Sequence, residues 1–148
     1  MFIKLADLDG DGMEDVIGAV RGGPLLFHRR VSKNPPTWET HEIEMPPHTG
    51  TGKGVAIGDI DGDGRADLVF SCENAHDRKS GVMWMSYGES PAEGKWEARE
   101  ISGPEGVKFD LVELLDLDGD GDLDVITCEE RDNLGVVWYE NPGHRSPQ

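Results

Sequence analysis

Short apolar runs alternate along this chain with turns that are rich in glycine and aspartate. Within most runs, apolar and polar residues alternate with a period of two, which is the pattern of a β-strand with one buried face. β-Branched and aromatic residues are frequent in the runs, and no stretch has the periodicity of an amphipathic helix. The pattern therefore predicts an all-β fold of short antiparallel strands joined by tight turns.

The runs recur in the same order around a repeated acidic turn, which divides the chain into three units. One strand precedes the turn, a second follows it directly, and a third begins at a glycine further on. These strands are predicted over Ile3–Ala6, Asp15–Ala19, Gly23–Phe27, Val55–Gly58, Asp67–Ser71, Gly81–Met85, Val112–Leu115, Asp124–Cys128 and Gly135–Tyr139. A fourth strand with the shared pattern Trp-Glu-x-x-Glu-Ile is predicted over 38–43 and 96–101. Trp84 and Trp138 hold equivalent places in the repeat, and Leu26 takes that place in the first unit.

Four-stranded units that recur about every 50–60 residues are typical of a β-propeller, in which each unit forms one blade. We predict a single repeat domain over 1–148, with blades over 1–46, 47–103 and 104–141 and a tail over 142–148. The third blade lacks its last strand. Because a closed propeller has about 4–8 blades, three blades form either a partial propeller or part of an oligomeric ring, such as a ring of two copies. A single chain would then expose apolar side chains on its two outer faces.

The acidic turn has the pattern Asp-x-Asp-Gly-Asp-Gly-x-x-Asp in all three units, over 7–15, 59–67 and 116–124. Four carboxylates so close together repel one another, which indicates that a cation lies among them. Ca²⁺ takes about six to eight oxygen ligands, and positions 1, 3, 5 and 9 of the pattern offer carboxylates at a suitable spacing. Position 7 offers a main-chain carbonyl, and glycines at positions 4 and 6 suit the tight turn. The three carbonyls are those of Met13, Arg65 and Asp122.

Other interpretations of the acidic turns fit less well. An EF-hand loop shares the first five positions, but its twelfth must be glutamate, where these turns have Gly18, Phe70 and Thr127. Zinc is disfavoured because no histidine or cysteine lies at ligand spacing, and Mg²⁺ suits a flexible carboxylate loop less well than Ca²⁺ does. An Asp-Gly turn without a metal would account for one isolated copy. Three matching copies favour calcium.

The repeated turn and its flanking strands resemble the FG-GAP/VCBS repeat family, the calcium-loop propeller blades that are also seen in the heads of integrin α-subunits. The resemblance covers nearly all of residues 2–141, although the usual Phe-Gly and Gly-Ala-Pro signatures are absent, which fits the VCBS-like branch better. It implies a propeller of about six or seven blades, of which this chain supplies three. It also implies metal ligands in every acidic turn. These are Asp7, Asp9, Asp11 and Asp15, then Asp59, Asp61, Asp63 and Asp67, then Asp116, Asp118, Asp120 and Asp124.

The chain has 30 acidic and 14 basic residues and a formal net charge of −16. This balance argues against a nucleic-acid partner, because phosphate-backbone binding needs clustered lysine and arginine. Arg29, Arg30 and Lys33 form a short basic run that we interpret as the exposed end of a hairpin. No apolar run reaches the ~20 residues of a membrane-spanning helix, and Met1–Leu5 has no signal-peptide pattern. Because calcium is plentiful outside cells, we expect a secreted or periplasmic protein.

Neither a catalytic triad, a phosphate-binding glycine loop nor a zinc motif is present, so we assign no catalytic residue. We interpret the chain as a calcium-binding propeller segment that acts as a scaffold or recognition module, in which calcium is structural. The alternative is a fragment of a secreted carbohydrate-active enzyme, of the polysaccharide lyase or sugar dehydratase type, or a lectin built on the same blades.

The loops at the end of the blades opposite the acidic turns are the candidates for contact with a carbohydrate or protein ligand. They join the second strand to the third, or one blade to the next. Their residue types suggest His48, His76, Arg78 and Arg131 as ligand-binding residues. The recurring strand tryptophans are assigned to packing between blades. The two cysteines fall on opposite strand faces of the repeat and are expected to be free buried thiols.

Overall fold

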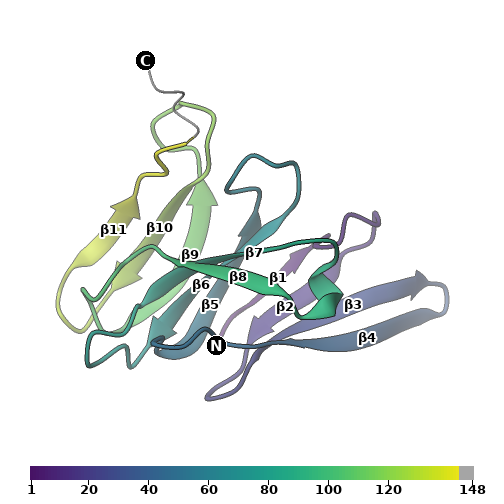
Figure 1. The fold of residues 1–148 in the computed structure, drawn as a ribbon, viewed down its shortest axis with the longest axis horizontal. Coiled ribbons are helices and arrows are strands. Elements are labelled where there is room, and N and C mark those ends of the chain that lie inside the picture. Colours follow the sequence, from purple (N-terminus) through teal and green to yellow (C-terminus); the bar gives the residue numbers. More distant parts are fainter. Residues whose placement is uncertain (144–148) are drawn as a thin grey trace.

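The computed structural model describes residues 1–143 and contains three antiparallel β-sheets that lie side by side (Figure 1). The strand orders are β1-β2-β3-β4, β5-β6-β7-β8 and β11-β10-β9. The strands are β1 (Ile3–Ala6), β2 (Asp15–Ala19), β3 (Leu25–Lys33), β4 (Pro36–Ile43), β5 (Thr51–Gly58), β6 (Asp67–Glu73), β7 (Val82–Tyr87), β8 (Trp96–Glu100), β9 (Phe109–Leu115), β10 (Asp124–Glu129) and β11 (Gly135–Tyr139). A short 3-10 helix, η1 (Pro91–Glu93), precedes β8. The predicted all-β fold of three antiparallel units, the third with three strands, is confirmed within the described residues.

The largest departure from the predicted strands is in the hairpin of β3 and β4. The sequence pattern ends the third strand at Phe27, but β3 continues to Lys33 and pairs with β4, with one irregularity after Arg30. Arg29 and Arg30 are therefore half-buried strand residues, which corrects the interpretation of this basic run as an exposed hairpin end; of the three, Lys33 is exposed. The physical reason is cross-strand pairing, since Arg29 lies opposite Glu39 and their opposite charges favour extension of the ladder.

The second sheet is covered on both faces by its neighbours. Every residue of β6 from Asp67 to Cys72 is buried. Leu68 and Phe70 belong to the apolar core between the first and second sheets, whereas Val69 belongs to the core between the second and third. Because successive side chains of a strand point to opposite faces, one strand supplies both cores. The sheets are thus stacked like neighbouring propeller blades, with β5 in contact with both β1 and β9.

Two glycines allow the second and third sheets to approach closely. A Cβ at Gly54 would lie 2.6 Å from the Asp110 carbonyl oxygen. In its place, Ser71 Oγ accepts a 3.0 Å hydrogen bond from the Gly54 N–H and donates to the Asp110 carbonyl. The buried ring of Phe109 covers Gly81, where a Cβ would lie 2.2 Å from Phe109 Cε2. Larger residues at these positions would push the two sheets apart.

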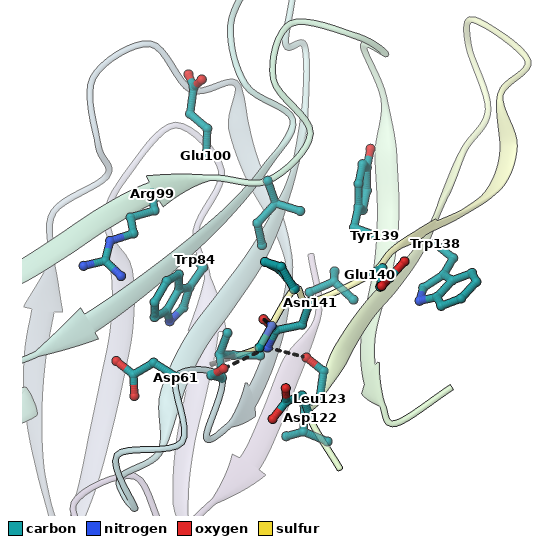
Figure 2. Close-up of a pocket in the computed structure, with 15 residues that line it drawn as sticks. Asp61, Trp84, Arg99, Glu100, Asp122, Leu123, Trp138, Tyr139, Glu140 and Asn141 are labelled. Atoms are coloured by element: carbon teal, nitrogen blue, oxygen red, sulfur yellow. Dashed lines mark hydrogen bonds between the residues drawn. The ribbon is translucent and has the colours of Figure 1, made fainter. Parts of the chain in front are cut away.

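A hydrogen bond to the second residue of an acidic turn ties each sheet to the next. Tyr87 Oη on β7 donates at 2.8 Å to the carbonyl of Leu8, which is buried in the core between the first two sheets. At the equivalent place in the second unit, Asn141 Nδ2 donates at 2.8 Å to the Ile60 carbonyl, one of the dashed lines in Figure 2. The corresponding Leu117 of the third unit is 44% exposed. The acidic turns therefore couple neighbouring sheets as well as closing their own hairpins.

Large apolar side chains are exposed on the two outer sheets, as expected for three blades. On β1, Ile3 and Leu5 are 67% and 57% exposed, and on β11, Val136 and Trp138 are 76% and 47% exposed. Their counterparts in the second sheet are covered by its neighbours: Val55 and Val82 are buried, and Ile57 and Trp84 are half-buried. No helix within residues 1–143 is long and apolar enough to cross a membrane.

The strand register corrects one assignment within the repeat. Trp84 and Trp138 each pair with the residue two positions after the last aspartate of their own turn. In the first sheet that residue is Ile17, and its partner is Phe27 and not Leu26. A count of three residues from the preceding glycine gives Trp84 in the second sheet and Leu26 in the first. The count misleads in the first sheet because the pairing of β3 with β2 begins one residue further from its glycine than the pairing of β7 with β6.

Both cysteines are free, as predicted, but only one is fully buried. Cys72 is 0% exposed on β6, and burial raises the pKa of its thiol to about 12. Cys128 on β10 is half-buried. Of the predicted tail over 142–148, residues 144–148 lie outside the described part of the chain.

Candidate metal centres

The three acidic turns fold into the same loop, in which backbone N–H groups hold the carboxylates. In the first loop, Gly12 N donates to Asp7 Oδ2 at 2.8 Å, and Met13 N donates to Asp11 Oδ1 at 2.9 Å. The same pair of hydrogen bonds measures 2.9 and 2.9 Å in the second loop and 3.2 and 3.0 Å in the third. The glycine at position 6 has a φ of 82° in the first loop, which a side chain would disfavour. The repeated spacing therefore dictates one repeated backbone shape.

The last aspartate of each loop is buried at the start of a strand. Asp15, Asp67 and Asp124 are 0%, 2% and 1% exposed. In each of them Oδ2 accepts the N–H of loop position 2, at 2.9–3.1 Å. In the first and third loops, Oδ1 accepts a second main-chain N–H at 2.8 Å, from Arg30 and Asn141 respectively. One buried carboxylate thus joins the start of the loop to the strand beside it.

These buried carboxylates differ in how readily they ionise. Burial raises the pKa of Asp67 to about 6, because desolvation outweighs its hydrogen bonds. Burial also raises the pKa of Asp15, with repulsion from Asp9 and Asp11 in addition. Burial acts in the same direction on Asp124, but its main-chain hydrogen bonds outweigh it and lower the pKa. A cation beside Asp15 and Asp67 would favour their charged forms.

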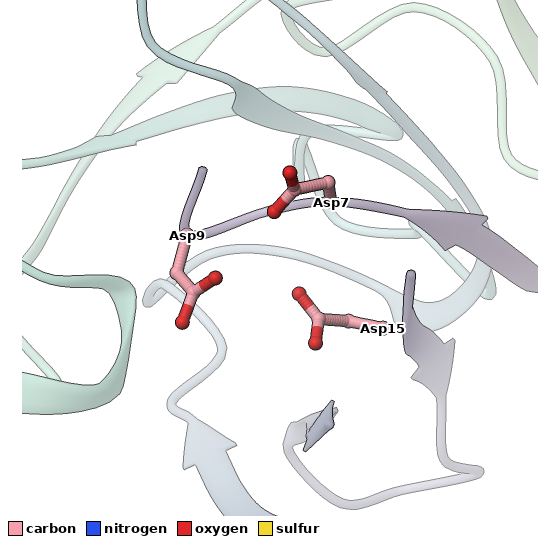
Figure 3. Close-up of side chains that lie close together, drawn as sticks. All are labelled: Asp7, Asp9 and Asp15. Atoms are coloured by element: carbon pink, nitrogen blue, oxygen red, sulfur yellow. The ribbon is translucent and has the colours of Figure 1, made fainter. Parts of the chain in front are cut away.

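Three carboxylates converge in each loop, with one oxygen from each lying within 4.8 Å of the others. The converging groups are Asp7, Asp9 and Asp15 in the first loop (Figure 3), Asp59, Asp61 and Asp67 in the second, and Asp116, Asp118 and Asp120 in the third. Two oxygens on opposite sides of a Ca²⁺ ion with bonds of ~2.4 Å would be about 4.8 Å apart. The donor type and the spacing therefore both fit a hard divalent cation. Ca²⁺ suits such a site because it binds several oxygen ligands in a flexible geometry.

The remaining predicted ligand carboxylates have other partners. Asp11 Oδ2 lies 3.4 Å from Arg29 Nη2, and Asp63 Oδ2 accepts from Arg65 Nε at 3.0 Å. Asp124 is held by the main chain as described above. The predicted carbonyl ligands lie in the same turns and stay predictions. They are those of Met13, Arg65 and Asp122.

Basic side chains from β3 reach the first loop, which the sequence analysis missed. Arg29 on β3 contacts Asp9 through Nε, and this hydrogen bond raises the pKa of the guanidinium further. Lys33 Nζ donates to the Gly12 carbonyl at 3.1 Å. Within residues 1–143, no lysine or arginine forms an ion pair with an aspartate of the third loop. Arg29 could be assigned to this loop from its place on a strand that runs back beside it. That inference requires the full length of β3, which the sequence pattern did not predict.

At the opposite end of the sheets, the structure brings two of the four predicted ligand residues together. Arg131 Nη1 lies 3.4 Å from His76 Nε2. His48 and Arg78 are exposed and have positive φ of 63° each. All the non-glycine residues with positive φ in the described part of the chain belong to loops of this end. They are His48, Asn74, Asp77, Arg78 and Asn133. Such conformations often cluster where loops carry function.

Comparison with known proteins gives a family match and two distant relatives. Residues 7–70 match the sequence model of the FG-GAP-like repeat. The chain is 29% identical over 139 residues to a T-cell immunomodulatory protein homolog of Plasmodium falciparum (isolate 3D7), a match that covers 84% of this chain and 19% of that protein. It is 25% identical over 140 residues to the rhamnogalacturonan exolyase YesX of Bacillus subtilis (strain 168), covering 80% of this chain and 22% of the exolyase. The chain thus spans less than a quarter of the length of these curated relatives. No solved structure shows a significant match.

The matched residues include the first two acidic loops, which share one hydrogen-bonding pattern. The third loop lies beyond the match and has the same pattern. Three stacked antiparallel sheets, each with such a loop between its first two strands, form a β-propeller-like module. Residues 7–70 of this chain thus match the FG-GAP-like repeat, which agrees with the resemblance of the acidic turns and their flanking strands.

Proposed function

We propose that the chain is a calcium-binding β-propeller segment that serves as a scaffold or recognition module, and that its calcium is structural. The convergence of three carboxylates in each of three loops carries this proposal. An isolated acidic cluster is common on protein surfaces. The third cluster gathers Asp120 where the first two gather the last aspartate of the turn, but all three lie in the equivalent turn of their sheet and share two main-chain hydrogen bonds. This recurrence is better explained by a shared ligand. A site that offers only oxygen donors favours Ca²⁺ over zinc.

The position of the loops supports a structural role for the ion. Each loop closes the hairpin of the first two strands of a sheet, and two of the loops also accept a hydrogen bond from the next sheet. An ion that gathers the carboxylates would remove their mutual repulsion and hold the loop in the shape that the next sheet contacts. Binding free energy then becomes folding free energy.

Chelation tests the proposed role of calcium. At a free concentration about 100-fold above Kd, each site adds about 2.7 kcal/mol, which corresponds to roughly 5–10 °C in the melting temperature of a domain of this size. We expect excess EDTA to lower the melting temperature by many degrees and renewed Ca²⁺ to restore it. An unchanged melting temperature, in protein shown by elemental analysis to hold no metal, would rule the proposal out.

A pair of matched variants assigns the effect to a loop. Asp118→Asn removes a converging carboxylate of the third acidic loop, and Asp132→Asn removes an exposed carboxylate from the loop between β10 and β11, at the other end of the same sheet. Both change the net charge equally. We expect Asp118→Asn to lower the number of calcium ions bound per chain by one in native mass spectrometry, and Asp132→Asn to leave it unchanged. Equal behaviour of the two variants would show that binding is only a response to net charge.

We further propose that recognition uses the loops at the end opposite the acidic loops, with a carbohydrate or a protein as the ligand and no nucleic acid. The adjacent His76 and Arg131 and the exposed His48 and Arg78 support this assignment. Alanine at His76 and Arg131 should abolish binding of any partner found on a glycan array or by co-purification, without changing the melting temperature. Retained binding in that double variant would refute this location. A secreted or periplasmic location follows from the calcium proposal and is tested with it.

A second candidate function is suggested by one relative. The similarity to a protein named rhamnogalacturonan exolyase favours membership of this segment in a carbohydrate-active protein, either an enzyme or a lectin. The lack of an assigned catalytic residue in this chain favours the non-enzymatic role. Ultraviolet detection of unsaturated sugar products from rhamnogalacturonan, with the chain alone and with calcium, distinguishes the two: product formation would support the enzyme.

A further inference from the structure

A cavity of about 620 Å³ lies between the second and third sheets (Figure 2). One wall comes from β7 and β8 and includes Trp84 and Arg99, which are paired across the two strands. The other wall comes from the third sheet and includes Tyr139 and Val125, which are also cross-strand partners. The volume is in the range of sites that hold one small organic molecule. None of the residues assigned to recognition in the sequence analysis lines it.

The two walls present aromatic side chains toward the same space. Val125 belongs to the core between the second and third sheets, and Tyr139 packs against that core from the same face of the third sheet. Trp84 packs against it from the second sheet. Neighbouring strand residues point to opposite faces, so Trp138 is directed to the outer face of the third sheet although its main chain borders the cavity. The aromatic surface of the cavity is therefore that of Trp84 and Tyr139.

The polar groups around the cavity include both donors and acceptors. The Arg99 guanidinium stacks on the Trp84 ring at 4.7 Å from its centroid, and within residues 1–143 it forms no ion pair. Its N–H donors therefore remain available around the stacked edge. The carboxylate of Asp122 borders the same cavity and supplies acceptors, whereas Glu100 follows Arg99 in β8 and its side chain points to the opposite face of the sheet. Asn141 is committed to structure, because its Nδ2 donates to the carbonyls of Ile60 and Leu123.

The charges select among ligand classes. A cationic ligand is disfavoured, because Arg99 already occupies the cation position over the Trp84 ring and would repel a second positive charge. An anionic ligand is disfavoured because acidic side chains border the cavity, Asp122 among them. A neutral ligand with an apolar face and hydroxyl groups at its rim fits both restrictions, since a hydroxyl accepts from a guanidinium and donates to a carboxylate.

We propose that this cavity is a binding site for a neutral sugar. The C–H face of a pyranose ring would lie against Tyr139 or the Trp84 wall, and its hydroxyls would bond to Arg99 and to the Asp122 carboxylate. The site goes beyond the proposed roles of the calcium loops and of the opposite-end loops, and it shares no side chain with the second of these. Failure of either proposed function therefore leaves this site to be tested on its own.

The test is a titration of the chain, in calcium-containing buffer, with methyl glycosides of glucose, galactose, mannose, rhamnose and N-acetylglucosamine. Binding is followed by calorimetry and by saturation-transfer NMR. Two variants probe the site: Arg99→Ala on the exposed edge strand β8, and Tyr139→Leu, which keeps an apolar side chain. Two matched controls lie on the same strands outside the cavity, Glu97→Ala on β8 and Val136→Ala on β11.

We expect at least one neutral glycoside to bind, and each site variant to weaken it by about tenfold, which is the loss of one moderate contact. The controls should stay within about twofold of the parent chain. If Tyr139→Leu does not fold, Arg99→Ala decides the matter, because its side chain is exposed and its removal leaves the core intact. No binding by any of the neutral glycosides would overturn the proposal. So would equal affinity in Arg99→Ala, or tighter binding of glucuronate or choline than of every neutral glycoside.

Discussion

Tyr87 Oη on β7 lies 2.8 Å from the carbonyl oxygen of Leu8, the second residue of the first acidic loop. The two residues are 8% and 1% exposed, so this hydrogen bond is made inside the interface of two sheets. The loop that gathers carboxylates is therefore also a part of the packing between sheets. The metal binding that we propose and the stacking of the sheets would involve the same residues, so a change in one should affect the other.

Removing the tyrosine hydroxyl tests this coupling. Tyr87→Phe leaves the Leu8 carbonyl buried without a donor, and we expect the free energy of unfolding in urea to fall by about 1–3 kcal/mol. Tyr139→Phe is the control, because the half-buried Tyr139 hydroxyl forms no hydrogen bond to another residue of 1–143. Equal losses in the two variants would show that the contact with Leu8 contributes nothing specific.

Arg29 should weaken calcium binding at the first loop. Its guanidinium contacts Asp9 and Asp11, and it must give up part of these contacts to a divalent ion. In a background where Asp61→Asn and Asp118→Asn disable the other loops, we expect Arg29→Gln to raise the calcium affinity about threefold to tenfold by calorimetry, as for loss of one competing partly exposed charge. Arg30→Gln is the control, since Arg30 stacks on Trp38. Unchanged or weaker binding in Arg29→Gln would contradict competition.

The repeat made most of this architecture predictable from the sequence. The acidic pattern recurs three times, and the strands before it end, and those after it begin, where the period-two pattern places them, although β5 and β9 begin four and three residues earlier than predicted. Local spacing also accounts for the loop shape, because each carboxylate bonds an N–H within seven residues of itself. Such information is contained in a short window of sequence.

The features that could not be predicted depend on contacts between distant segments. The length of β3 depends on pairing with β4, and with it the contact of Arg29 with the first loop. The equivalence of Phe27 to Trp84 depends on register, which a count from the nearest glycine misplaces by one residue. The cavity beside Trp84 needs two sheets at a defined separation, and nothing in the local pattern of either sheet encodes it.

Glu129 holds two loops together at the end opposite the acidic turns. Its carboxylate is 2% exposed and accepts main-chain N–H groups from Val107, Lys108 and Asp132 at 3.2, 3.0 and 2.8 Å. Burial by itself raises the pKa of this carboxyl, but the N–H donors outweigh burial, and the pKa lies below its ordinary value. The charged form is thus favoured by folding, and it contributes stability above the ordinary pKa of a glutamate.

We therefore expect acid to reduce stability through Glu129. The contribution is complete above the unfolded-state pKa of about 4.5 and is lost as the pH falls through the lower pKa of the folded state. Glu129→Gln should reduce the free energy of unfolding at pH 7 by about 2–3 kcal/mol, because a neutral amide accepts these hydrogen bonds less strongly. Urea titrations from pH 7 to pH 3 should show that the difference from the parent chain shrinks below pH 4.5.

The variant Glu130→Gln, at the exposed neighbouring residue, should change stability little at any of these pH values. A difference between Glu129→Gln and the parent chain that stays constant with pH would refute the titration argument.

The closeness of the second and third sheets should make Gly81 intolerant of any side chain. A Cβ there would lie 2.2 Å from Phe109 Cε2, and the Phe109 ring is 0% exposed in the core between the two sheets. Gly81→Ala should therefore cost about 1–3 kcal/mol of unfolding free energy, the usual penalty for overpacking a core.

Gly88→Ala offers a matched control, because a Cβ at Gly88 would meet no atom within 4 Å and its φ is not positive. We expect that change to be neutral or to stabilise by about 0.4–1 kcal/mol through the unfolded chain. If the compact variant Phe109→Leu restores the stability lost in Gly81→Ala, the cost arises from this contact; if both variants lose stability additively, the glycine is required for a reason other than the ring above it.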